Sequence, residues 1–69
     1  MSSSVARVTE ISASSKVSFE DAVKVGVSRA TKTLRDVKGA WVKEQKVEVH
    51  DGNVTAYIVN LMVTFVLDD

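Results

Sequence analysis

Hydrophobic and polar positions alternate with a period of two near the C-terminus, from Asn53 to Leu67. One side of this stretch carries Thr55, Tyr57, Val59, Leu61, Val63, Phe65 and Leu67. The other side carries Val54, Ala56, Ile58, Asn60, Met62, Thr64 and Val66. The content of β-branched and aromatic residues predicts a strand whose first side faces the core. The second side is also too apolar to face water, and a strand of this kind needs cover on both faces. The pattern therefore predicts self-association.

A second pattern, from Phe19 to Asp36, has the spacing of an amphipathic helix. Its apolar side carries Phe19, Val23, Gly26, Val27, Ala30, Leu34 and, just beyond the helix, Val37. Ser18 followed by Asp21 approximates a capping box at the start, and Gly39 lies where glycine commonly ends a helix. Gly26 on the apolar side predicts close packing against a sheet, at some cost in helix propensity.

Two further segments have strand character. Val5 to Ala13 alternates imperfectly, as an edge strand does, and the polar run Ser12 to Lys16 predicts a loop after it. Ala40 to His50 separates into two faces: Trp41, Lys43, Gln45, Val47 and Val49 on one, and Ala40, Val42, Glu44, Lys46, Glu48 and His50 on the other. Asp51-Gly52 predicts a hairpin turn into the final strand.

The predicted order is β-α-β-β, an α+β fold with a three-stranded antiparallel sheet packed on one helix. We expect a single domain over residues 1–69, with residues 1–4 flexible. A chain of 69 residues buries only about 60% of the surface that its unfolded form exposes, so its stability alone would be marginal. Disulfides are excluded because the chain has no cysteine, and its single histidine cannot build a histidine-rich metal site. Oligomerisation is the remaining remedy.

The charge balance argues against several classes of partner. Lys plus Arg and Asp plus Glu are equal at nine each, so no overall field attracts nucleic acid or a membrane surface. No apolar run approaches the roughly 20 residues that span a bilayer, and the first residues lack the regions of a signal peptide. We therefore expect a cytoplasmic protein.

Three groups of residues are candidates for chemistry, and each has a simpler structural interpretation. Glu44, Glu48 and Asp51 cluster with His50, but a solvated strand face explains them better than an active site, and we expect no enzymatic activity. The basic helix side of Lys24, Lys32 and Arg35, with Arg29 and Lys38 nearby, is more typical of a solvated face than of a nucleic-acid site. Trp41 is expected to pack structurally, with a stacking wall for a planar ligand as the alternative.

The chain resembles the dodecin family over nearly its whole length. The resemblance rests on the β-α-β-β order, the length, the segment from Ser28 to Arg35 (S-R-A-T-K-T-L-R) and the ending from Val63 to Asp68 (V-T-F-V-L-D). It implies a homododecameric hollow sphere of cubic-type symmetry that binds flavins such as riboflavin or FMN in pairs between subunits, for storage and without catalysis. Neighbouring subunits would then cover the second face of the last strand.

The resemblance also marks two departures from the flavin-binding pattern. The position of the Trp that stacks on the flavin ring is Gly39 here, and Trp41 lies two residues later, about 6–7 Å along the strand. The position of the Gln that bonds the flavin's polar edge is Ile58, which offers no hydrogen bond. The candidate interface pocket therefore consists of Gly39, Trp41, Gln45 and Ile58, either altered or empty.

The segment from Val42 to Gln45 (V-K-E-Q) is instead similar to a branch of dodecin-like proteins that lacks this pair and is associated with calcium. Glu44 and Glu48 are the candidate ligands for calcium or another divalent cation, with Asp51 nearby, because their carboxylates are hard oxygen donors. The prediction is a non-catalytic shell that binds or stores a small ligand. A cation-binding or purely structural shell is the alternative, and a nucleic-acid-binding module is less favoured.

Overall fold

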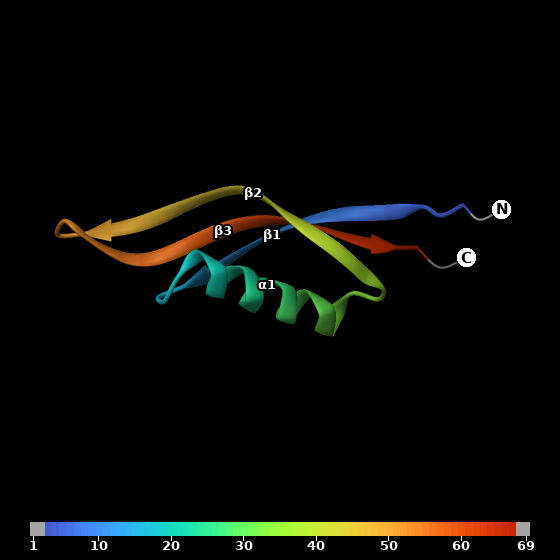
Figure 1. Cartoon of the computed structure of the whole chain (residues 1–69), viewed down its shortest axis with the longest axis horizontal. Helices are drawn as coiled ribbons and strands as arrows, with labels where there is room; N and C mark the ends of the chain where they lie inside the picture. Colours follow the sequence, from blue (N-terminus) through green and yellow to red (C-terminus); the bar gives the residue numbers. More distant parts are fainter. Residues whose placement is uncertain (1–2, 68–69) are drawn as a thin grey trace.

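A computed structural model of the chain describes residues 3–67. The elements are β1 (Ala6–Ser15), α1 (Phe19–Thr33), β2 (Val37–His50) and β3 (Asn53–Val66), as Figure 1 shows. The predicted β-α-β-β order is confirmed. Of residues 1–4, predicted to be flexible, residues 1–2 lie outside the described part. Ser3 and Ser4 are exposed and precede β1, and their flexibility stays a prediction.

The last strand is the centre of the sheet. The strand order is β1-β3-β2, and β3 pairs antiparallel with both neighbours. Helix α1 lies across one face of this sheet (Figure 1). Under it the β3 side chains of Val59, Leu61 and Val63 are fully buried, together with Ala22 and Ala30 of the helix. The predicted core face of β3 is confirmed, and β1 occupies the predicted edge position.

Helix and sheet approach each other most closely at Gly26. A Cβ atom built at this position would lie 2.8 Å from Leu61 Cδ1 and 3.0 Å from Ala13 Cβ. The first distance would force Leu61 to shift and the second is tighter than almost all packed contacts, so glycine lets the helix lie this deep on β1 and β3 without displacing buried neighbours. The prediction of close packing at Gly26 is confirmed.

Strand β1 continues two residues past its predicted end, through the serine-rich segment that was predicted to be a loop. That prediction was wrong because the small residues still alternate in register. Ala13 and Ser15 turn inward opposite Val59 and Tyr57 and are buried. Ser15 also ties the strand to the helix: its hydroxyl donates to Asp21 Oδ2 at 2.6 Å and accepts from the Val17 amide at 2.9 Å.

The helix begins as predicted and ends earlier. Ser18 is the N-cap, and its side chain accepts a hydrogen bond from the Asp21 amide. The helix ends at Thr33 rather than at Asp36, because the backbone is already extended at Leu34 and turns through a left-handed conformation at Asp36 (φ 54°). Gly39 therefore does not end the helix; it lies inside β2, which begins at Val37 instead of Ala40.

A bulge in β2 changes which residues share a face. Val42 pairs with Leu61 but Glu44 pairs with Asn60, so Lys43 is an extra residue in the strand. The strict alternation predicted for Ala40 to His50 was wrong for this reason. Trp41 lies on the same face as Glu44, and Gln45 lies on the opposite face, toward the helix. The Asp51-Gly52 turn was predicted correctly, and its φ angles of 50° and 79° suit a tight hairpin.

Replacement of Gly26 tests the close contact between helix and sheet. Gly26→Ala gains about 1 kcal/mol of helix propensity but overpacks the core, which costs about 1–3 kcal/mol. We expect thermal denaturation to show a lower melting temperature, which corresponds to a decrease of up to about 2 kcal/mol in the free energy of unfolding. Ser28→Ala, on the exposed side of the same helix, is the control and should cause no loss. A stabilised Gly26→Ala protein would contradict this packing.

Candidate functional site

The sheet face that points away from α1 is the candidate site, and we call it the outer face. It consists of alternate residues of all three strands: Val8, Glu10, Ser12 and Ser14 of β1, Ile58, Asn60, Met62 and Thr64 of β3, and Gly39, Trp41, Glu44 and Lys46 of β2. No element of the described chain covers this face (Figure 1). The β3 residues on it are half-buried by their strand neighbours alone.

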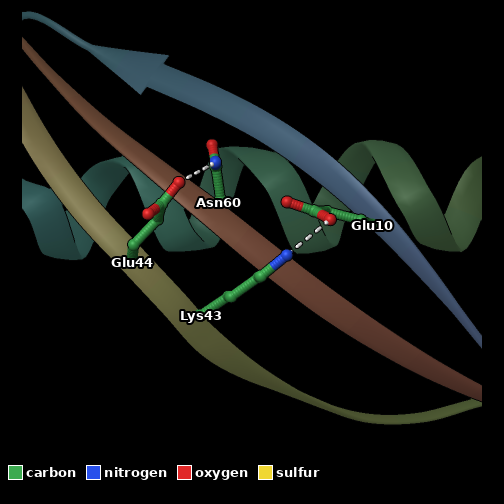
Figure 2. A network of polar contacts seen from close by, with 4 residues as sticks. All are labelled: Glu10, Lys43, Glu44 and Asn60. Atoms are coloured by element: carbon green, nitrogen blue, oxygen red, sulfur yellow. Dashed lines mark hydrogen bonds and ion pairs between the residues drawn. The ribbon is translucent and has the colours of Figure 1, made fainter.

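Two polar contacts cross the middle of the outer face (Figure 2). Lys43 Nζ of β2 lies 3.2 Å from Glu10 Oε1 of β1, so this ion pair reaches over the central strand. Asn60 Nδ2 of β3 donates to Glu44 Oε1 of β2 at 2.9 Å. The bulge makes both contacts possible, because it presents Lys43 and Glu44 together on this side. The central region of the outer face is therefore polar, with apolar residues on both sides of it.

Trp41 lies beside this polar region. It pairs with Met62 on β3, and half of its surface (52%) is exposed. Gly39 lies two residues before it on the same face, opposite Thr64, and a Cβ atom there would meet nothing within 4 Å. The indole and the open space above Gly39 form an apolar shelf that a planar group or another copy of the chain can cover.

The other two residues of the predicted pocket do not join this shelf within one chain. Ile58 is on the outer face but pairs with Lys46, four residues along β3 from Met62, which corresponds to about 13 Å. Gln45 pairs with Val59 and points to the helix side. The structure thus brings Gly39 and Trp41 together, places Ile58 on the same face at a distance, and places Gln45 on the opposite face.

The candidate cation ligands are spread along β2. Glu44 pairs with Asn60 and Glu48 with Ala56, so both face outward but lie about 13 Å apart, with Lys46 between them. Asp51 is at the hairpin, where its Oδ2 lies 3.4 Å from His50 Nε2. Within residues 3–67, no three acidic, histidine or cysteine side chains gather as metal ligands. An ion at Glu44 would need carboxylates from several copies of the chain.

Three residues that make the polar contacts on the outer face were not predicted from the sequence: Glu10, Asn60 and the bulge residue Lys43. Their contacts depend on the bulge, and a strictly alternating strand would have placed Lys43 and Glu44 on opposite faces. One signal was available. Asn60 is the only amide among otherwise apolar or hydroxyl-bearing residues on its side of β3, and a half-buried amide requires a partner.

A one-layer sheet with a helix on one side and a half-apolar outer face on the other defines a class of small α+β proteins. The chain matches the family model described as Dodecin over residues 5–68, so it belongs to the dodecin family. This confirms the resemblance found in the sequence. No curated protein sequence matches the chain.

Solved structures agree with this membership. Dodecin from Streptomyces coelicolor is 33% identical, with a TM-score of 0.93, and the match covers 100% of this chain and 99% of that one. Dodecin from Streptomyces davaonensis is 31% identical over 99% of this chain and all of that one, again with a TM-score of 0.93. A calcium-chelating dodecin from Mycobacterium tuberculosis, described as having a novel calcium-binding site, is 32% identical over 93% of this chain and 91% of that one, with a TM-score of 0.80.

Family membership bears on two further predictions. Dodecins are non-catalytic, so the prediction that the protein is not an enzyme is confirmed. Dodecins form homo-oligomers, and self-association of this chain, which the apolar second side of its last strand indicates, stays a prediction. Within the described residues, the one helix is too short and too polar to cross a bilayer.

Trp41 provides a direct test of whether the outer face is covered in solution. It is the only tryptophan, so the protein's indole fluorescence comes from this face alone. We expect blue-shifted emission and weak acrylamide quenching in the native protein, because assembly removes water from the indole. After dissociation in urea, emission should shift to the red and quenching should increase. Native quenching equal to that of the dissociated protein would contradict a covered outer face.

Proposed function

We propose that the protein is a non-catalytic homododecameric shell that binds or stores a small ligand at subunit contacts on the outer face. The observation that carries this proposal is the apolar shelf of Gly39, Trp41 and Met62, which lies on a sheet face without cover in the single chain. Shell assembly would bury this shelf against another copy. A site that requires two copies also explains why the residues of the candidate pocket are scattered within one chain.

The ligand is not held in the standard flavin mode of the family. Gly39 supplies no ring at the usual stacking position, and Ile58 supplies no hydrogen bond at the usual polar position. A flavin edge buried against Ile58 without a partner costs about 1–3 kcal/mol, which weakens binding about 5- to 150-fold. Trp41 retains a stacking surface on the same face, so a planar ligand of different placement or polarity fits the shelf better than riboflavin does.

A cation-binding shell is the second candidate. It is supported by the calcium-chelating relative and by Glu44, whose carboxylate faces outward and is oriented by Asn60. A symmetry axis can bring one carboxylate from each of several copies to a single ion, so one Glu per chain suffices. Lys43 and Lys46, on either side of Glu44, weigh against this candidate because they oppose a positive ion.

The missing flavin contacts are tested by restoring them. Gly39→Trp has open space for the indole, and Ile58→Gln returns an amide to the outer face. We expect riboflavin to quench the fluorescence of the double variant at concentrations at least about tenfold lower than those needed for the native protein.

The control for this titration is Gly39→Trp alone. Its affinity for riboflavin should lie between those of the native protein and the double variant. Native protein that is isolated yellow, or that binds riboflavin as tightly as the double variant, would refute the claim that these two positions exclude the standard mode. The mass of the particle should remain unchanged in every variant, which separates ligand loss from failure to assemble.

The cation candidate is tested by calorimetry with calcium chloride on the native protein and on Glu44→Gln. If the shell binds calcium through Glu44, the native protein releases or takes up heat and gains thermal stability, and Glu44→Gln loses both effects. Glu20→Gln, which removes an exposed carboxylate of α1 away from the outer face, is the control. Absence of heat and of stabilisation in the native protein would eliminate the cation-binding shell.

A further inference from the structure

The β2–β3 hairpin extends beyond the rest of the chain. Strand β1 pairs with β3 only as far as Ser15 and Tyr57. Helix α1 begins at the same level, where the rings of Phe19 and Tyr57 pack edge to face with their centroids 5.1 Å apart. Residues 48–56 therefore form a two-stranded ribbon with neither a third strand nor a helix beside it (Figure 1). We call this ribbon the arm. It contributes to a shape 56 Å long and only 14 Å thick.

The arm exposes apolar surface that a two-stranded ribbon cannot protect. Val49 and Val54 pair with each other across it, and they are 61% and 49% exposed. An isolated hairpin is at best marginally stable in water, and a pair of exposed valines does not change that. The arm also carries two carboxylates, Glu48 and Asp51, and no Lys or Arg. It is thus an apolar and acidic projection without a binding partner in its own chain.

A groove of complementary character runs between α1 and the open edge of β1. It has a volume of about 610 Å³, and its apolar lining includes Ile11, Ala13, Val25, Ala30 and Leu34. Val25 is 48% exposed. Three cations lie along its helix side: Arg29 lines the groove itself, and Lys24 and Lys32 line the shallow depression next to it. Among the described residues, these three side chains form no ion pair within 4 Å.

We propose that the arm of one copy of the chain docks in the α1–β1 groove of a neighbouring copy. This inference rests on the proposed homo-oligomeric shell and assigns one of its contacts. The valines would cover the apolar lining, and Glu48 and Asp51 would face the cations along the helix. The two surfaces lie at different places on the chain, so the contact is heterologous and each copy uses its arm once and its groove once. Such a contact generates a closed ring or shell when the rotation between neighbouring copies closes, as the proposed shell requires. It also gives the basic side of α1 a role other than nucleic-acid binding.

Charge reversal across the proposed contact is the first test. We expect Glu48→Lys and Arg29→Glu each to move the urea midpoint of dissociation, followed by sedimentation velocity, to lower urea. The double variant should dissociate at a urea midpoint close to that of the native protein, because the ion pair is restored with opposite polarity. Lys38→Glu, an exposed reversal outside the groove, is the control. A double variant whose urea midpoint is no higher than that of the less stable single variant would overturn the assignment.

Cross-linking distinguishes this contact from docking of the arm on the outer face. The native chain has no cysteine, so engineered pairs report without background. In the Val49→Cys/Val25→Cys variant, a short bis-maleimide should produce a ladder of covalent multimers under denaturing electrophoresis. Val49→Cys/Met62→Cys, which places the second thiol on the outer face, should remain largely uncoupled.

The reverse cross-linking pattern, on a particle of native mass, would overturn the arm–groove contact and leave the proposed shell intact. A native protein that sediments as a single chain would instead refute the shell, and the contact with it. The two failures are therefore distinguished by the particle mass measured alongside each reaction.

Discussion

The constraint on which this structure depends is the need to cover both faces of β3 with only one helix. Val59, Leu61 and Val63 are buried under α1, and the close approach at Gly26 makes that cover tight. On the other side, Ile58, Met62 and Thr64 have only their strand neighbours. The radius of gyration is 14.4 Å, against about 11 Å for a compact domain of this length. The single chain is thus extended and leaves one face of β3 without cover, and in the proposed shell other copies of the chain supply that cover.

The polar contacts on the outer face serve specificity more than stability. The Lys43–Glu10 pair is exposed on both sides, and pairs of this kind contribute at most about 1 kcal/mol. Their position matters more, because they place fixed charges and an oriented amide in the middle of the surface that neighbouring copies cover in the proposed shell. A partner surface that left these groups dry and unpaired would be penalised, so they select among possible orientations. The bulge at Lys43 creates this arrangement, and it also separates Gln45 from the shelf of Gly39 and Trp41.

The elements with strong local signals could be predicted from the sequence. The Ser18 cap, the core face of β3, the Gly26 contact and the Asp51-Gly52 turn each depend on residues near one another in the chain. The errors arose where distant residues decide. Leu34 becomes extended, and Val37 joins β2, because the strand pairs with Phe65. The bulge that moves Gln45 to the helix side follows from register against β3, which alternation within β2 cannot reveal. The prediction of the candidate pocket assumed a regular strand. In the structure, only Gly39, Trp41 and Ile58 of its four residues share the outer face.

Self-assembly is the central claim, and the mass of the native particle in solution tests it most directly. Sedimentation equilibrium or light scattering of the untagged protein should give about 90 kDa, which corresponds to twelve chains of 7.5 kDa. The value should not change on moderate dilution, because the proposed shell buries the outer face of every copy. A mass of one or two chains would leave β3 uncovered and would contradict this account.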